Sequence, residues 1–192
     1  MSIRSSLLAA LLGLLALGGP STGATMYYLP DGVLAQMATA IVVGRVAGLA
    51  PRLDPARQLV VTAALIEVDE YVKTPAGAPP RLEVLTVGGR AGGLATLQPG
   101  APRFQPGEKV LMYLVPDRDS RYRVLAMARG KYHVERAPGG DAELVRLDLE
   151  GLTQIDPSTG REIPADLIPA ATGKVYLDDL VVTLRRSLAG RR

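Results

Sequence analysis

The chain has 192 residues, of which 47% are hydrophobic and 21% are charged, and its net charge is +3. This composition is typical of a globular protein with a packed core and excludes a disordered chain. A charge this small argues against a dedicated polyanion-binding protein. The chain has no cysteine, which excludes a disulfide framework. It has one Phe and no Trp, so we expect an aliphatic core.

The N-terminal residues have the pattern of a secretory signal sequence. A single charge, Arg4, precedes an apolar run over residues 7–17, and small residues continue from there to Ala24. The apolar run is shorter than the ~20 residues that a helix needs to cross a bilayer. We therefore expect residues 1–24 to be a signal peptide, cleaved between Ala24 and Thr25. The mature protein would then have no transmembrane segment and be exported, either to the periplasm or to the medium.

The first elements of the mature chain are a helix and two strands. Apolar residues at helical spacing predict a short helix over residues 31–40. Residues 40–49 predict a strand that is apolar on both faces, as in the centre of a sheet. Pro51 and Pro55 then predict an interruption. The longest predicted strand follows over residues 59–72.

Three more strands complete the predicted barrel. Residues 81–87 alternate as a third strand, and the stretch 88–107, rich in glycine and proline, predicts a long connection. The fourth strand is predicted over residues 108–115. The fifth is predicted over residues 121–135, with a bulge or bend at Gly130. This pattern predicts a mainly β fold, a five-stranded closed barrel like the oligosaccharide/oligonucleotide-binding (OB) barrel.

The C-terminal part has a different pattern. We assign residues 25–136 to the OB-like domain and residues 137–192 to an extension that packs on it. Alternation over residues 143–149 predicts an extra strand, and residues 153–172 resemble a loop. Residues 177–188 predict an amphipathic helix that covers one face of the barrel. Its apolar stripe could instead bind a partner.

Several short motifs between residues 38 and 135 occur in a fixed order. They are Ala38-Thr-Ala-Ile-Val-Val-Gly-Arg-Val46, Tyr71-Val-Lys73, Gly88-Gly89, Pro102-Arg-Phe-Gln-Pro-Gly-Glu108 and Gly130-Lys-Tyr-His-Val134. In this order they resemble a poorly characterised bacterial family of exported domains. The layout is also similar to the netrin/tissue-inhibitor-of-metalloprotease class of OB domains. The resemblance implies an OB fold. It also implies protease inhibition, in which the mature N-terminus, Thr25 to Tyr28, reaches the metal of the target.

Residues that could form a catalytic or metal site are few. The chain has no cysteine and one histidine, His133, which excludes Cys-His pairs and sites with several histidines. His133 and Glu135 share a predicted strand face, but two ligands do not make a metal site. No serine of the mature chain lies in a Gly-x-Ser-x-Gly elbow, and residues 88–93 lack the Gly-Lys-Ser/Thr ending of a phosphate loop. We predict no catalytic residue, no metal ligand and no cofactor.

Basic residues gather around the predicted fifth strand. They are Arg118, Arg121, Arg123, Arg129, Lys131 and Arg136. We select Arg121, Arg123, Lys131 and His133 as a candidate ligand-binding face for an anionic glycan, a lipid head group or an acidic protein surface. Nucleic acid is disfavoured because acidic residues dilute the basic ones and because the protein is expected to be exported. A solvated barrel face with no ligand is the alternative.

These patterns favour an exported, non-enzymatic binding or scaffold domain of unknown ligand. Its expected partners are an envelope protein or an anionic glycan. The first alternative is a netrin-like inhibitor of an exported protease. The second is an uncharacterised envelope hydrolase, for which no constellation of catalytic residues is present in the sequence.

Overall fold

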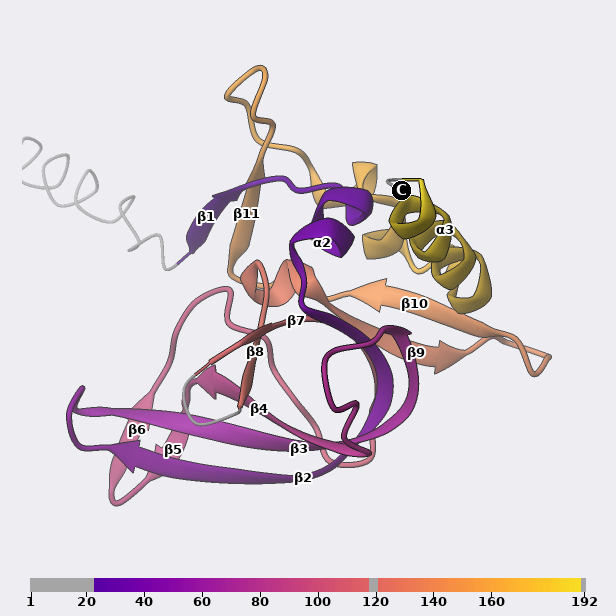
Figure 1. Ribbon diagram of the computed structural model, residues 1–192. Helices are drawn as coiled ribbons and strands as arrows, with labels where there is room; N and C mark the ends of the chain where they lie inside the picture. Colours follow the sequence, from indigo (N-terminus) through magenta and orange to yellow (C-terminus); the bar gives the residue numbers. More distant parts are fainter. Residues whose placement is uncertain (1–22, 118–120, 191–192) are drawn as a thin grey trace, which may run out of the picture.

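The computed structural model describes residues 23–117 and 121–190 and is mainly β, with one large sheet and a C-terminal helix (Figure 1). The predicted signal peptide lies outside these residues except for Gly23 and Ala24. Residues 118–120, which include Arg118 of the basic residues named above, also lie outside the described residues. Within the described ranges, no helix is both long enough and apolar enough to cross a membrane.

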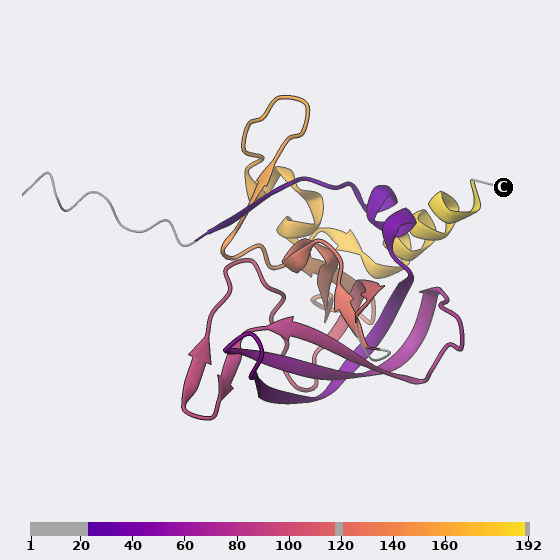
Figure 2. The ribbon, with the colours of Figure 1, turned by 60° about the vertical axis from the view of Figure 1, so that its left-hand side comes forward.

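The N-terminal segment forms a strand that the sequence did not predict. β1 (Ala24–Tyr27) pairs in parallel with β11 (Leu152–Ile155), and the two form a small sheet of their own. Figures 1 and 2 both show this pair beside the larger sheet. The predicted short helix is confirmed as α2 (Asp31–Met37). Asp31 lies in its first turn, where a negative charge interacts favourably with the helix dipole.

The large sheet contains most of the remaining strands. They are β2 (Ala40–Asp54), β3 (Leu59–Lys73), β4 (Arg81–Val87), β7 (Lys109–Pro116), β8 (Tyr122–Val124), β9 (Lys131–Arg136), β10 (Glu143–Leu147) and β12 (Val175–Tyr176). Their order is β12-β10-β9-β7-β2-β3-β4-β8, and β8 pairs a second time, with β7. The β4–β8 pair is parallel, whereas the other pairs of this sheet are antiparallel.

The β2–β3 hairpin is longer than predicted. The predicted break at Pro51 is wrong, because Pro51 lies within β2, opposite Thr62 of β3. β7 pairs with β2 only as far as Arg45, so the later part of β2 has a strand partner on one side only, among the described strands. Proline has no N–H to donate, and at such an edge none is needed for the ladder. The arginine that follows, Arg52, therefore stays on a regular strand.

The predicted loop 88–107 contains a small hairpin. β5 (Gly89–Ala91) and β6 (Leu94–Thr96) pair in antiparallel fashion around a two-residue turn. Gly92 and Gly93 have φ of 57° and 77°, as the turns that fit a tight hairpin require. A Gly-Gly pair is a recognised signal for such a turn, so this prediction missed an available sequence pattern.

The predicted fifth strand is divided into two strands. β8 and β9 are separated by η1, a 3-10 turn over Met127–Gly130, which Ala126 and Met127 enter with φ of 59° and 54°. The predicted interruption near Gly130 is confirmed, but it is a helical turn and not a bulge. A Cβ at Gly130 would lie 1.8 Å from the carbonyl oxygen of Leu125, so only glycine fits there.

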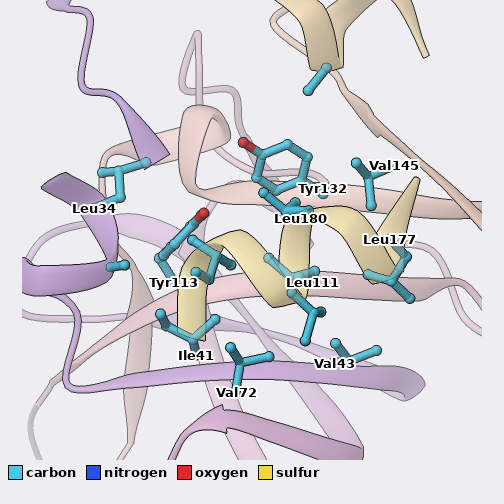
Figure 3. Packing of buried hydrophobic residues seen from close by; sticks show 14 of the residues in the cluster. Leu34, Ile41, Val43, Val72, Leu111, Tyr113, Tyr132, Val145, Leu177 and Leu180 are labelled. Carbon is cyan, nitrogen blue, oxygen red and sulfur yellow. The ribbon is translucent and has the colours of Figure 1, made fainter. Parts of the chain in front are cut away.

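Buried side chains form two clusters on the two faces of the sheet. One lies among β2, β3, β4 and β7 and includes Phe104. The other lies between the sheet, α2 and α3 (Leu177–Ala189). In Figure 3 these labelled side chains gather in one place: Leu34, Ile41, Val43, Val72, Leu111, Tyr113, Tyr132, Val145, Leu177 and Leu180. The predicted C-terminal helix and its buried face are confirmed.

The rest of the C-terminal region is less loop-like than predicted. The predicted extra strand is confirmed as β10, which pairs with β9 and so extends the large sheet. The predicted loop 153–172 contains most of β11 and two short 3-10 turns, η2 (Ala165–Leu167) and η3 (Pro169–Thr172). The strand was missed because its partner, β1, lies more than a hundred residues away in sequence.

Gly44 of β2 provides a test of this packing. A Cβ at Gly44 would lie 2.4 Å from the carbonyl oxygen of Glu67, whereas a Cβ at Gly48, in the same strand, would have no atom within 4 Å. We expect Gly44→Ala to lower the free energy of unfolding by about 2–3 kcal/mol, because the β2 and β3 backbones must separate. Gly48→Ala should change it by less than about 0.5 kcal/mol. Urea denaturation of both variants measures this difference, and equal stabilities would contradict the packing described.

Candidate functional site

The four residues of the predicted binding face do not lie together. Arg121 and Arg123 lie at β8, whereas Lys131 and His133 lie on β9, and η1 separates the two strands. Arg121 and Arg123 line one cleft, and His133 lines another. The predicted face is therefore two separate places with different charges.

The cleft beside β8 is built from the end of β2, the β2–β3 loop, β3, β4 and β8, and has a volume of about 510 Å³. We call it the arginine cleft. Its charged lining residues are Arg52, Asp54, Arg57, Asp117, Arg121 and Arg123, and its apolar ones include Val61, Leu85 and Val87. Among the described lining residues, four arginines against two aspartates give a formal charge of +2.

Strand register explains why these residues share one face. Val61 lies opposite both Arg52 and Val87 in neighbouring strands, and Leu85 lies beside Arg123. Residues that pair across strands project on the same side of a sheet. The alternate residues of β4, Leu82 and Val84, project to the other side and are buried.

The β2–β3 loop is held by its own aspartate. One Asp54 carboxylate oxygen accepts hydrogen bonds from the backbone N–H groups of Ala56 (3.0 Å) and Arg57 (3.2 Å). This is a turn that aspartate favours through its short side chain. The turn brings Arg52 and Arg57 to the same end of the hairpin, a consequence that the sequence analysis missed although the Asp-Pro turn signal was present.

Three arginines of the cleft, Arg52, Arg57 and Arg123, have long ion pairs or, among the described residues, none. Arg52 and Arg121 approach Glu83 at 3.4 Å and 3.9 Å, and Arg57 approaches Asp54 at 3.9 Å. Arg123 is exposed, and within the described part of the chain no acidic side chain pairs with it. Exposed ion pairs at such distances contribute little to stability. The guanidinium groups of Arg52, Arg57 and Arg123 are therefore available to an incoming anion at little cost.

The second cleft, of about 490 Å³, has balanced charges. Its charged lining residues, His133 apart, are Arg45, Lys109, Arg136 and Arg146 together with Glu108, Glu135, Glu143 and Asp148. Two of its ion pairs are close, Lys109–Glu143 at 2.7 Å and Arg146–Glu135 at 2.9 Å. A lining whose charges sum to zero does not attract an anion.

Lys131 is buried beside this second cleft and does not contribute an exposed positive charge. It is 3% exposed, and its Nζ lies 2.9 Å from Glu108 Oε1 and 5.0 Å from the centroid of the Phe104 ring. It also donates a hydrogen bond to the Arg103 carbonyl. The predicted role of Lys131 in an exposed face is thus not supported by its position.

His133 completes the cluster around Glu108. Its Nδ1 lies 2.8 Å from Glu108 Oε2, its Nε2 lies 3.4 Å from Lys131 Nζ, and its side chain is 18% exposed. Burial lowers the pKa of Lys131. Burial also raises the pKa of Glu108, but the hydrogen bond from His133 and the charge of Lys131 outweigh it, and the pKa falls below its ordinary value. These partners make the cluster a structural one.

Arg129, also among the predicted basic residues, belongs to the core. It is 1% exposed, and its guanidinium donates to Asp31 (3.0 Å) and to the Tyr132 hydroxyl (2.8 Å). Tyr113 (3.0 Å) and Tyr132 also donate to the same Asp31 oxygen. Burial raises the pKa of both tyrosine hydroxyls, so they remain protonated donors. No local pattern predicts this network, because Asp31 and Arg129 are far apart in sequence.

The remaining residues considered in the sequence analysis are engaged in contacts within the fold. Thr25 to Tyr28, which the resemblance assigned to the metal of a target protease, runs along β11 as β1 and the residue after it. Ser158 donates its hydroxyl to Asp156 (2.6 Å), and Ser187 donates to the Thr183 carbonyl (3.0 Å). Among residues 23–117 and 121–190, no group of three or more His, Cys, Asp or Glu side chains could hold a metal ion.

Comparison with known proteins does not assign the chain to a family. No protein-family model matches the chain, and no curated protein has a significantly similar sequence. The structure thus offers two charged places: the arginine cleft on β2, β3, β4 and β8, and a buried ionic cluster at Glu108 on the other side of η1.

The ionic cluster predicts a pH-dependent stability. The Glu108 pKa lies below its ordinary value of 4.5 in the folded protein, so the carboxylate contributes stability at neutral pH that is lost as the pH falls through the folded-state pKa. We expect Glu108→Gln to lower the free energy of unfolding by about 3 kcal/mol at pH 7, because Lys131 loses its counter-ion in a buried position. At pH 3 the difference from wild type should shrink.

Urea denaturation at the two pH values measures this effect. Glu135→Gln is the matched control, because Glu135 pairs with Arg146 at the exposed surface and should change stability by less than about 0.5 kcal/mol. A Glu108→Gln variant as stable as this control at pH 7 would contradict the structural role of the cluster.

Proposed function

We propose that the protein is an exported, non-enzymatic binding domain and that the arginine cleft binds an anionic ligand. One observation carries the proposal: four arginines from the end of β2, the following loop and the region of β8 line a single cleft. Arginine forms bidentate hydrogen bonds with carboxylate, sulfate and phosphate groups. An anion that displaces the long ion pairs of Arg52 and Arg57 loses little of the existing stability.

We also propose that β2, β3, β4, β8 and β7 form a closed OB-like barrel. In support, β7 pairs with β2, β2 with β3, β3 with β4, β4 with β8 and β8 again with β7. The series is closed by β8, which pairs in parallel with β4 and in antiparallel fashion with β7.

The position of the cleft supports both proposals together. OB barrels bind ligands on the face of the second and third strands, between the loop that joins strands one and two and the loop that joins strands four and five. The arginine cleft lies on β3 and β4, with Pro55 to Arg57 of the first of these loops and Asp117 of the second among its lining residues. The charged site is thus where the proposed fold binds its ligands.

A binding role fits the chemistry of the cleft better than catalysis does. The described lining contains arginines, two aspartates, one threonine and apolar residues. General acid–base or nucleophilic catalysis needs a positioned base beside the nucleophile or acid that it serves. The two residues most suited to such a pair, His133 and Lys131, lie at the buried cluster and are already engaged with Glu108.

The proposal predicts salt-sensitive binding of anions that depends on the cleft. Immobilised sulfated oligosaccharide, uronate oligosaccharide and polyglutamate serve as probes, with neutral dextran as the reference. We expect the mature protein to bind at least one anionic probe, more weakly as salt rises. The double variant Arg52→Gln/Arg123→Gln should lower the affinity about tenfold or more, through loss of about 1.4 kcal/mol or more.

The control is Arg136→Gln, which removes one arginine charge, where the double variant removes two, from a side chain outside the cleft that is 77% exposed. It should leave the affinity within about twofold. If no anionic probe binds at low salt, or if the control weakens binding as much as a cleft variant does, the proposal is wrong.

A further inference from the structure

We infer that the ligand of the arginine cleft is an acidic, extended polypeptide segment that also carries aliphatic side chains. The inference rests on the proposed function and names the class of its partner. Three properties of the cleft support it: its apolar floor, the kinds of polar side chain that line it, and the position of one carboxylate, that of Glu83.

The floor of the cleft is aliphatic. Val61 and Val87 lie opposite each other on β3 and β4, and Leu85 lies next to Arg123 of β8. Leu65 continues the same face of β3 and is 41% exposed. Burying such side chains under a ligand is favourable only if the ligand presents apolar surface of its own.

The described lining residues include no aromatic ring on which a base could stack and few groups that pair with neutral sugar hydroxyls. No aromatic ring is among the described lining residues, although single-stranded nucleic acids bind proteins by stacking their bases on such rings. No asparagine or glutamine is among them either, and Thr86 is the sole hydroxyl-bearing residue. A sugar pressed on Val61, Leu85 and Val87 would leave several of its hydroxyls without partners, at a cost for each.

The carboxylate of Glu83 indicates which kind of group the arginines bind. It lies between two of them, 3.4 Å from Arg52 and 3.9 Å from Arg121. The pair with Arg52 is long, so a second carboxylate can approach the same guanidinium group. Arg123 offers a further one. The geometry therefore suits aspartate or glutamate side chains that lie a few ångströms from an aliphatic surface.

An extended polypeptide meets these requirements together. Its side chains alternate between two sides, so every second residue faces the cleft, at a spacing of about 6.6 Å. Acidic and aliphatic residues on that side can contact the arginines and the floor of the same sheet face. A volume of about 510 Å³ holds a short segment and not a folded domain. The expected partner is thus an envelope protein with an exposed acidic segment that contains valine, leucine or isoleucine.

The test compares defined probes by isothermal titration calorimetry. The first is a synthetic octapeptide with four glutamates and four leucines or valines, and the second is the same peptide with glutamine for glutamate. The third is octaglutamate, the fourth a sulfated oligosaccharide of similar charge, and the fifth an oligothymidylate. We expect the acidic-aliphatic peptide to bind at least tenfold more tightly than every other probe.

Two variants test the carboxylate and the floor separately. Glu83→Gln removes the competing carboxylate and should tighten binding of the acidic-aliphatic peptide several-fold, a change that damage to the fold would not produce. Leu85→Asn should weaken that peptide about tenfold and leave the sulfated oligosaccharide within twofold. Circular dichroism of each variant establishes that it is folded at the assay temperature.

The outcomes distinguish the inferred class of ligand from the proposed function. Tighter binding of the oligosaccharide, the oligothymidylate or octaglutamate, weakened by Arg52→Gln/Arg123→Gln, would overturn the inference and leave the proposed function intact. Binding of no anionic probe, or binding indifferent to the two arginines, would overturn both. Equal binding of the acidic peptide and its glutamine counterpart would also overturn the inference.

Discussion

One carboxylate, that of Asp31, joins the N-terminal helix to the large sheet. It accepts hydrogen bonds from Tyr113 of β7, Arg129 of η1 and Tyr132 of β9. Arg129 is 1% exposed, and a buried charge is tolerated only with a close partner of opposite sign. The position of α2 therefore depends on η1, and the position of η1 depends on α2. α2 and α3 together cover one face of the sheet.

This constraint explains why the basic residues of one sequence region have different roles. η1 separates β8 from β9, so residues that are neighbours in sequence lie at different sites. Arg129 is part of the core network, Lys131 is the counter-ion of Glu108, and Arg123 remains exposed in the cleft. Charge and exposure, and not residue type, distinguish the proposed ligand site from the two structural ones.

Local patterns predicted the elements whose residues interact with near neighbours. The alternation of β4 and the apolar stripe from Leu177 to Leu188 gave the third strand and the C-terminal helix. Features that depend on distant partners were missed. β1 is defined by β11, and Asp31 is defined by Arg129. Pro51 could be placed within a strand only once the shorter reach of β7 along β2 was known.

The candidate site was likewise predicted only where it depends on residues that are close in sequence. The sequence indicated basic residues near the fifth strand, and Arg121 and Arg123 do line the arginine cleft. It did not indicate Arg52 and Arg57, which reach the cleft through the β2–β3 hairpin, or the burial of Lys131. Both depend on strand register and on packing between segments that are far apart in sequence. Charge clustering along the chain was thus a partial guide to charge clustering in space.

The most direct test of the account is a nuclear magnetic resonance titration of isotope-labelled mature protein with the acidic-aliphatic octapeptide. The account predicts that the backbone amide shifts change most at the cleft-lining residues of β3 and β4 and at Arg52 and Arg123. The amides around Glu108 and His133 should stay unchanged. Shifts confined to the Glu108 region, or to α2 and α3, would contradict the claim that the arginine cleft is the binding site.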